Sequence, residues 1–219
     1  MSLGLPPTTE LIETMRLNRQ GQVLLLPLHL QRIALSARQL GFTWSQSAAL
    51  TALAPYLHQR YQQTQRLRLS LAKDGRLTVQ CSPLHFTPQP TYVALAPQPI
   101  QAQPLYLRHK TTQRQHWATS ELWLQQHPHY FDVVHYDEQG FITEGGRSNI
   151  YIYHEQQWWT PPTSQDLLAG VQRTALIQQG LVQEKHITVS ELISAQHIRV
   201  SNALRGWLNA KLKTPTTLF

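Results

Sequence analysis

The chain has 219 residues, of which 41% are hydrophobic and only 14% charged, so neutral side chains, including 27 glutamines, must supply much of the polar surface. The longest apolar stretch, near residues 23–28, is far shorter than the ~20 residues of a membrane-spanning helix, and the N-terminus lacks the basic and apolar segments of a signal peptide. A single cysteine, Cys81, excludes an intrachain disulfide and a thiolate metal cluster within one chain. We therefore expect a cytoplasmic protein that contacts no membrane.

The net charge of +7 is concentrated in the first half of the chain. Residues 1–110 contain eleven basic and three acidic residues, whereas residues 111–219 contain eight basic and nine acidic ones. A basic half can bind nucleic acid, but these residues form neither a run nor one face of a helix. An arginine-rich surface and the attraction of a small anionic substrate or cofactor are the other interpretations.

Local patterns predict strands and two helices in the first half. Segments 66–71 and 77–81 alternate between apolar and polar residues on either side of Asp74-Gly75, which is typical of a β-hairpin. Apolar residues recur at helical spacing over 29–41, where Gly41 is a stop signal. The other elements expected here are strands over 10–17, 22–27 and 91–96 and a helix over 45–62.

Six prolines between residues 83 and 104 predict a boundary between a small domain, 1–103, and a larger domain, 104–219. In the larger domain we expect strands partly joined by hairpins, together with a few helices, which favours an α+β fold with two lobes. The expected strands cover 132–135, 141–144, 148–153, 158–160 and 198–201, and the expected helices cover 113–126, 171–179 and 191–195, the last capped by Ser190.

Several kinds of site are not indicated by the sequence. His127, His129 and His135 lie close together, but their spacing is not that of a zinc site, so we expect no metal. Neither a G-x-S-x-G nucleophile motif nor a Walker phosphate-binding loop occurs.

The sequence around two residues indicates that they are candidates for catalysis or ligand binding. Arg108 and the basic half both favour the neutral amine of Lys110, and a neutral lysine can act as a nucleophile and a general base. Glu144 lies between a predicted strand and two glycines, where a carboxylate can hold a ligand cation. A solvated lysine and an ordinary turn glutamate are the alternatives. Residues 145–148 could form either an anion-binding nest or a tight turn.

Six groups of residues occur in order along most of the chain. They are Glu13-Thr14-Met15-Arg16, His29-Leu30-Gln31-Arg32, Arg108-His109-Lys110-Thr111-Thr112-Gln113-Arg114, Thr143-Glu144-Gly145 with Ser148-Asn149 and Thr160-Pro161-Pro162, Leu168-Ala169-Gly170-Val171-Gln172-Arg173, and Ser201-Asn202-Ala203-Leu204-Arg205-Gly206. In this order and spacing, they resemble the class IV aminotransferase family, the fold-type IV enzymes that use pyridoxal 5'-phosphate (PLP). Within that family the chain is most similar to the 4-amino-4-deoxychorismate lyases.

The resemblance implies that six residues bind the cofactor, of which Asn202 also lines the substrate. Lys110 matches the lysine that binds PLP covalently, and Glu144 matches the glutamate that keeps the pyridinium nitrogen protonated. Arg32 matches the arginine that contacts the phosphate. Val171 and Gln172 match the helix N-terminus whose backbone N–H groups bind the phosphate, although many relatives have Ile-Thr there.

The resemblance also implies residues on the substrate side. Asn202 matches a position that lines the substrate and contacts the phosphate, and Thr14 and Arg108 complete the expected set. The segment Ser201-Asn202-Ala203-Leu204 resembles the lyase pattern, which implies conversion of 4-amino-4-deoxychorismate to 4-aminobenzoate and pyruvate with Lys110 as the general base. A class IV aminotransferase acting on D- or branched-chain amino acids is the alternative.

The fold implied by the resemblance is the α+β, two-lobed architecture of D-amino acid aminotransferase-like enzymes. A small N-terminal α/β domain would precede a larger C-terminal, β-barrel-like domain, and relatives are homodimers, so we expect a homodimer with a small anionic substrate. Nucleic-acid binding by the basic half, with the PLP residues unused, is the competing hypothesis, and the intact Lys110 and Glu144 argue against it.

Overall fold

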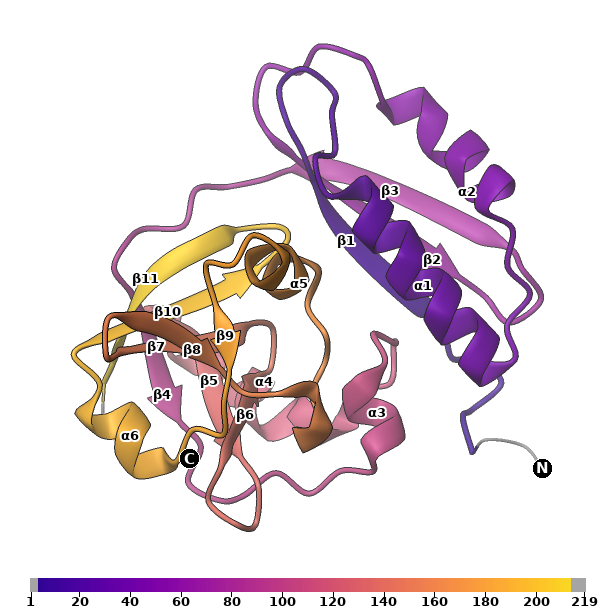
Figure 1. The fold of residues 1–219 in the computed structure, drawn as a ribbon. Coiled ribbons are helices and arrows are strands. Elements are labelled where there is room, and N and C mark those ends of the chain that lie inside the picture. Colours follow the sequence, from indigo (N-terminus) through magenta and orange to yellow (C-terminus); the bar gives the residue numbers. More distant parts are fainter. Residues whose placement is uncertain (1–3, 214–219) are drawn as a thin grey trace. The chain divides into compact units, whose positions relative to one another are not determined.

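The computed structural model describes residues 4–213, and the chain divides into two compact units (Figure 1). The first unit comprises Met1–Phe86 and His109–Gln113, and the second comprises Thr87–Arg108 and Arg114–Phe219. The chain therefore leaves the second unit for a short segment that belongs to the first unit, and then returns.

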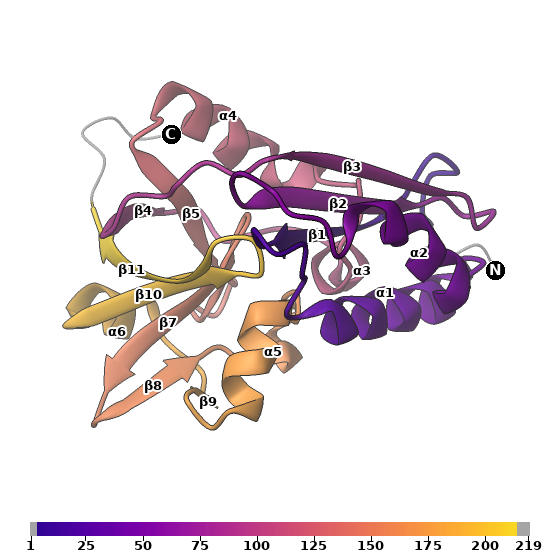
Figure 2. The ribbon, with the colours of Figure 1, turned by 90° about the horizontal axis from the view of Figure 1, so that it is seen from above.

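The first unit is an antiparallel sheet of three strands in the order β1-β2-β3, with two helices. Figures 1 and 2 show both helices on one face of the sheet, where α1 packs against β1 and α2 against β3. The elements are β1 (Leu11–Leu17), α1 (Leu26–Leu40), α2 (Gln46–Leu53), a 3₁₀ turn (Ala54–Tyr56), β2 (Gln65–Leu71) and β3 (Leu77–Pro83).

Strand alternation places the core of the first unit. Leu11 of β1 lies opposite Leu71 of β2, and both are 1% exposed on the side that the helices cover. Thr14 and Arg68, also opposite each other, lie on the other face and are only half-buried. Because side chains of a strand point alternately to the two faces, the hairpin pattern in the sequence predicted this division correctly.

Two predictions for the first unit are wrong, whereas the helix stop at Gly41 is confirmed. The strand expected over 22–27 is instead a turn followed by α1, because Pro27 suits the first turn of a helix and cannot donate to a strand ladder. The helix expected over 45–62 ends early, in a 3₁₀ turn that contains Pro55. The stop at Gly41 is confirmed: its φ is 70°, and its N–H donates to the carbonyl of Ala37.

The second unit is a mixed, strongly curled sheet of eight strands in the order β6-β5-β4-β11-β10-β7-β8-β9 (Figure 2). Its strands are β4 (Thr91–Leu95), β5 (Tyr130–Tyr136), β6 (Ile142–Gly145), β7 (Asn149–His154), β8 (Gln157–Thr160), β9 (Gln183–Glu184), β10 (His197–Asn202) and β11 (Gly206–Leu212). Its helices are α3 (Pro104–Arg108), α4 (Ala118–Gln126), α5 (Val171–Gln178) and α6 (Val189–Ser194), with 3₁₀ turns at Gln115–Trp117 and Thr163–Gln165.

The curled sheet is covered on both faces. Ile150, Val200 and other buried residues of the strands pack with Leu192 of α6 on one face. On the other face Tyr151 packs against Leu176 of α5. Among residues 4–213, no helix has both the length and the apolar character needed to cross a lipid bilayer.

Three features of the second unit differ from the sequence-based expectations. Strands β9 and β11 were not predicted, and β11 follows the segment expected to be the last strand. Helix α6 is capped by Thr188 rather than Ser190, through a capping box with Glu191. Strand β4, expected in the small domain, pairs with β5 and β11. The boundary after residue 103 stays a prediction.

Candidate functional site

Three consecutive residues of β1 connect the first unit's predicted site residues. The N–H of Ile12 donates to the carbonyl of Lys110 at 2.9 Å. The carboxylate of the next residue, Glu13, accepts hydrogen bonds from Arg32 of α1. Thr14 follows, on the face away from the helices. Strand β1 thus bonds to the backbone of the predicted lysine and, through Glu13, to the predicted phosphate-binding arginine, whereas the predicted substrate-side Thr14 lies on the face opposite Arg32.

The segment that carries Lys110 is fixed to the edge of β1. The N–H of Thr112 donates to the carbonyl of Glu10 at 2.9 Å, and the Thr112 hydroxyl accepts from the N–H of Glu10 at 3.0 Å. Nδ1 of His109 lies 2.9 Å from the hydroxyl of Ser36 on α1. These bonds hold the backbone on both sides of Lys110, whose own side chain is half-buried.

In the second unit, Glu144 is almost fully buried near the end of β6, at 5% exposure. Its Oε1 accepts a hydrogen bond from the N–H of Leu168 at 2.9 Å. The side-chain amide of Asn149, at the start of β7, donates to the backbone carbonyl of Leu168 at 3.0 Å. Two side chains therefore hold both backbone groups of Leu168, just before α5 begins.

The N-terminus of α5 depends on a close approach that only glycine allows. Gly170 is the N-cap, and a Cβ added there would lie 1.9 Å from Oδ1 of Asn149. Having no side chain, Gly170 cannot cap the helix itself, and neither of the next two residues, Val171 and Gln172, is acidic. The first N–H groups and the helix dipole of such a terminus favour an anion.

A fully buried aspartate supports the turn after Glu144. Oδ2 of Asp132 accepts hydrogen bonds from the hydroxyl of Ser148 at 2.6 Å and from the N–H of Arg147 at 3.1 Å. Burial raises the pKa of Asp132, against the lowering effect of these bonds. Since the N–H groups of Gly145 and Gly146 donate to the carbonyls of Ser148 and Val133, residues 145–148 form a tight turn rather than an anion nest.

Asn202, at the end of β10, is tied to the same turn. Its Nδ2 donates to the carbonyl of Arg147 at 3.0 Å, and its Oδ1 accepts from the N–H of Arg205 at 2.8 Å. The preceding Ser201 shares a buried 2.7 Å hydrogen bond with the hydroxyl of Tyr151. The structure therefore brings Asn202 and the turn after Glu144 together.

Arg108 is linked to the segment before α5. Its Nε donates to Oδ1 of Asp166 at 2.6 Å, and its Nη2 pairs with the same oxygen. Asp166 has a positive φ of 52° and lies two residues before Leu168. Residues 166–170 are therefore held by side chains from three places: Arg108, Glu144 and Asn149.

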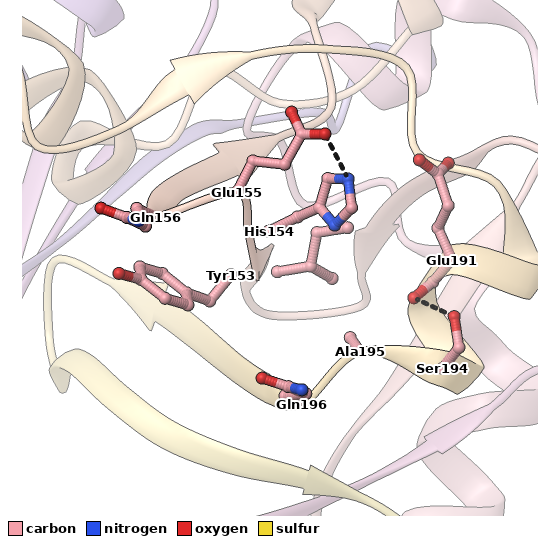
Figure 3. A pocket seen from close by; sticks show the side chains of 9 residues that line it. Tyr153, His154, Glu155, Gln156, Glu191, Ser194, Ala195 and Gln196 are labelled. Atoms are coloured by element: carbon pink, nitrogen blue, oxygen red, sulfur yellow. Dashed lines mark hydrogen bonds and ion pairs between the residues drawn. The ribbon is translucent and has the colours of Figure 1, made fainter.

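A separate hollow of about 430 Å³ lies between the β7–β8 turn and α6 (Figure 3). Figure 3 shows His154 and Glu155 paired on one side of it and Ser194 bonded to the backbone of Glu191 on the other. Its lining contains none of the site residues predicted from the sequence. The paired His154 and Glu155 are exposed side chains of a surface hairpin, so this hollow differs in kind from the buried, hydrogen-bonded clusters around Glu13 and Glu144.

The residues present fit a cofactor that has a ring nitrogen and a phosphate. In the second unit a buried carboxylate suits a pyridinium nitrogen and an uncapped helix N-terminus suits a phosphate. In the first unit, taken by itself, an arginine suits a phosphate. Within residues 4–213, no group of three or more His, Cys, Asp and Glu side chains is placed to hold a metal ion. Three residues that shape these clusters, Glu13, Asp132 and Asn149, had no role predicted from the sequence, although two of them lie inside the family motifs.

Known proteins resemble the chain over most of its length. The model of the family described as amino-transferase class IV matches residues 10–212, so the chain belongs to this family. A relative from Schizosaccharomyces pombe, named "Putative aminodeoxychorismate lyase", is 30% identical over 169 residues, which cover 75% of this chain and 72% of the relative.

Solved structures share the fold of the chain. One, described as a "Putative amino-acid aminotransferase" from Mesorhizobium loti, is 30% identical with a TM-score of 0.81, covering 94% of this chain and 100% of that one. The branched-chain aminotransferase from Thermoproteus uzoniensis is 16% identical with a TM-score of 0.80, covering 93% of this chain and 78% of that one. These similarities confirm the predicted α+β, fold-type IV architecture.

Proposed function

Because the chain belongs to the class IV amino-transferase family, whose members depend on PLP, we propose that it is a lyase that converts 4-amino-4-deoxychorismate to 4-aminobenzoate and pyruvate. One observation carries the cofactor part of the proposal: Asn149 and Glu144 hold the segment that leads into α5, so a buried carboxylate and a helix N-terminus are parts of one hydrogen-bonded cluster. The Schizosaccharomyces pombe relative and the segment Ser201-Asn202-Ala203-Leu204 support the lyase part.

Each residue of this set has a distinct role in the proposal. When bound, PLP supplies an electron sink for the carbon that bears the substrate nitrogen. Glu144 stabilises the protonated ring nitrogen, and its hydrogen bond from Leu168 fixes the direction of its carboxylate. Arg32 and the N–H groups of Val171 and Gln172 bind the phosphate.

Lys110 carries the proton in the lyase reaction. As a neutral amine, its Nζ would take the proton from the substrate carbon that bears the nitrogen. The C–O bond on the neighbouring carbon then breaks, the enolate of pyruvate leaves with the bonding electrons, and the ring becomes aromatic. The proton on Nζ can pass to the terminal carbon of the enolate to give pyruvate, which balances the reaction without an oxidant or a reductant.

A class IV aminotransferase acting on D- or branched-chain amino acids is the second candidate. The Mesorhizobium loti structure, at 30% identity, carries an aminotransferase description and favours it. Both reactions share the proton removal by Lys110 and differ in the fate of the neighbouring carbon. Asn202 would line the substrate in either reaction, and Thr14 and Arg108 would contribute to substrate binding.

The test begins with the absorbance spectrum of the purified protein with PLP. We expect a visible band that borohydride bleaches and that Lys110→Ala lacks, with Lys73→Ala as the matched control. Supplying 4-amino-4-deoxychorismate should then yield 4-aminobenzoate and pyruvate in equal amounts. Transfer of an amino group from a D- or branched-chain amino acid to a 2-oxo acid would support the alternative, and absence of the band would overturn both.

The proposal extends to assembly and partners. We propose a homodimer, which sedimentation of the purified protein tests directly. The basic first half would serve an anionic substrate and cofactor rather than nucleic acid, so a salt-dependent shift of labelled DNA or RNA would contradict this part.

A further inference from the structure

Glu13 is a carboxylate among leucines. It lies on the face of β1 that the helices cover, opposite Leu69 and two residues from Leu11 and Met15, and it is 1% exposed. In the described sheet of the first unit, no other charged side chain lies on that face. A charge in such a place is costly unless it is paired and hydrogen-bonded, so its partners explain why it is there.

The partners of Glu13 are two residues of α1. Oε1 accepts a hydrogen bond from Nε of Arg32 at 2.8 Å, and Oε2 accepts from Nη2 of Arg32 at 2.6 Å. Oε2 also lies 2.6 Å from Nδ1 of His29, which is 1% exposed. His29 and Arg32 are three residues apart in the helix, so both side chains reach the same side of it.

These contacts keep Glu13 ionised. Burial raises the pKa of Glu13, but the charge of Arg32 and the hydrogen bonds from His29 and Arg32 lower it to about 2 overall. The side chain of Arg32 is 14% exposed, against 2% for Glu13, so part of the arginine reaches the surface whereas the carboxylate does not.

The pairing fixes the plane of the guanidinium. A bidentate contact engages the Nε–Nη2 edge, which holds the guanidinium in one orientation relative to the Glu13 carboxylate. An unanchored arginine loses rotamer freedom when it binds a ligand, whereas an anchored one has already lost it. The pair therefore aims Arg32 at one direction before any phosphate arrives.

We propose that Glu13 and His29 are positioning residues that hold the Arg32 guanidinium ready for the cofactor phosphate, an inference that rests on the proposed function. Glu13 contacts neither the phosphate nor the reacting atoms in this proposal and acts through Arg32 alone. His29 acts one step further away, by holding Oε2 of Glu13.

The test compares the binding of PLP and of pyridoxal, which lacks the phosphate, to the apo form of the full chain. The dissociation constant for pyridoxal divided by that for PLP measures how much the phosphate contributes to binding. We expect Arg32→Ala to reduce this ratio about 100-fold and Glu13→Gln about 10-fold, both through weaker PLP binding, with pyridoxal affinity unchanged within about twofold. Glu121→Gln, which removes the carboxylate paired with Arg114, is the matched control and should leave the ratio unchanged.

A double variant tests whether Glu13 acts through Arg32. Adding Glu13→Gln to Arg32→Ala should weaken PLP binding no further, because the residue that Glu13 orients is gone. If Glu13→Gln does not fold, as judged by circular dichroism, His29→Gln keeps the ion pair and should reduce the ratio about threefold.

Three outcomes would overturn the inference. Equal weakening of PLP and pyridoxal by Glu13→Gln would mean that the carboxylate only supports the fold. Tighter PLP binding would mean that Glu13 competes with the phosphate for Arg32. A ratio unchanged by Arg32→Ala would mean that Arg32 does not contact the phosphate. Failure of the unaltered chain to bind PLP would instead reject the proposed function.

Discussion

The two units hold their candidate site residues by different kinds of interaction. In the first unit a buried ion pair, Glu13 with Arg32, fixes a long side chain. In the second unit Glu144 and Asn149 hold a segment of main chain through hydrogen bonds to the backbone of Leu168. A flexible guanidinium needs a fixed counter-charge, whereas a loop before a helix needs its peptide groups satisfied.

This difference determines the perturbation to which each unit should respond. A buried ion pair depends on the ionisation of its carboxylate. A backbone segment packed closely against glycines is disturbed by an added methyl group, because the neighbouring atoms leave no room for it. The first unit should therefore respond to a change of pH through Glu13, and the second to an added methyl group at its closely packed glycines.

Acid should weaken the first unit through Glu13. The pKa of this residue is about 2 in the folded chain, against an ordinary value of 4.5, so its contribution is complete above about pH 4.5 and is lost as the pH falls toward 2. A difference of this size corresponds to about 3 kcal/mol. Urea unfolding at pH 6 and pH 3 should show that the free energy of unfolding falls less on acidification in Glu13→Gln than in the unaltered chain.

Asp132 in the second unit should act in the opposite direction. Burial raises its pKa, so the folded chain binds this proton more readily than the unfolded chain, and its contribution becomes less favourable as the pH rises above 3.8. Asp132→Asn should therefore increase the loss of unfolding free energy between pH 6 and pH 3, whereas Glu13→Gln should reduce that loss. The same direction of change in both variants would contradict the comparison.

A single methyl group should disturb the second unit at Gly145. A Cβ there would lie 2.2 Å from Oδ2 of Asp132, and three hydrogen bonds hold that carboxylate in place. At the neighbouring Gly146 the nearest atom would be 3.5 Å away, which is ordinary contact. We expect Gly145→Ala to lower the free energy of unfolding by about 2 kcal/mol and Gly146→Ala to change it by less than about 0.5 kcal/mol.

Urea unfolding at pH 7 measures this pair of variants. Gly145→Ala, the less stable variant, should also bind PLP less tightly, because the turn that it disturbs comes directly after Glu144. Equal stability of the two alanine variants would show that the turn after Glu144 can shift to make room.

Replacing an amide by a carboxylate should loosen the entry to α5. In Asn149→Asp the side chain can no longer donate to the carbonyl of Leu168, and it places a negative charge beside the helix N-terminus proposed to bind phosphate. We expect a loss of about 1 kcal/mol in stability and weaker binding of PLP, with binding of pyridoxal less affected. Asn209→Asp is the matched control, because its oxygen accepts from Nε of Arg199 and the carboxylate keeps that role.

Local signals explain most of the fold that the sequence predicted. Helix α1 and the β2–β3 hairpin depend on periodicity, on Gly41 and on Asp74-Gly75, all of which act within a few residues. Strand β11 was missed although it forms a hairpin with β10, in which Asn202 lies opposite Gly206. Only its second pairing is remote, because Ala210 lies opposite Thr91 of β4. The strand expected over 22–27 was wrong because apolar content was weighed above the helix signal of Pro27.

Matching motifs predicted which residues belong to the candidate site, but not which side chains contact one another. Lys110, Glu144 and Arg32 were found because each fits a motif, and their roles stay predictions. Which side chain holds which segment depends on contacts between residues far apart in sequence, as with Asp132. One signal was available for Glu13: an acidic residue at an apolar position of an alternating strand needs a partner.

The smallest expected effect on stability is at the pair of Arg108 and Asp166. Their side chains are 55% and 33% exposed, so water screens the pair, and Asp166→Asn should change the free energy of unfolding by less than about 0.5 kcal/mol. Arg108 is also a proposed substrate contact, so Arg108→Lys should raise KM about 10-fold while kcat stays within about twofold, because lysine lacks the bidentate fork. Glu121→Gln, which breaks the comparably exposed pair with Arg114, should leave KM unchanged. A stability loss above about 1 kcal/mol in Asp166→Asn, without a change of KM in Arg108→Lys, would mean that the pair holds the 166–170 segment and does not bind substrate.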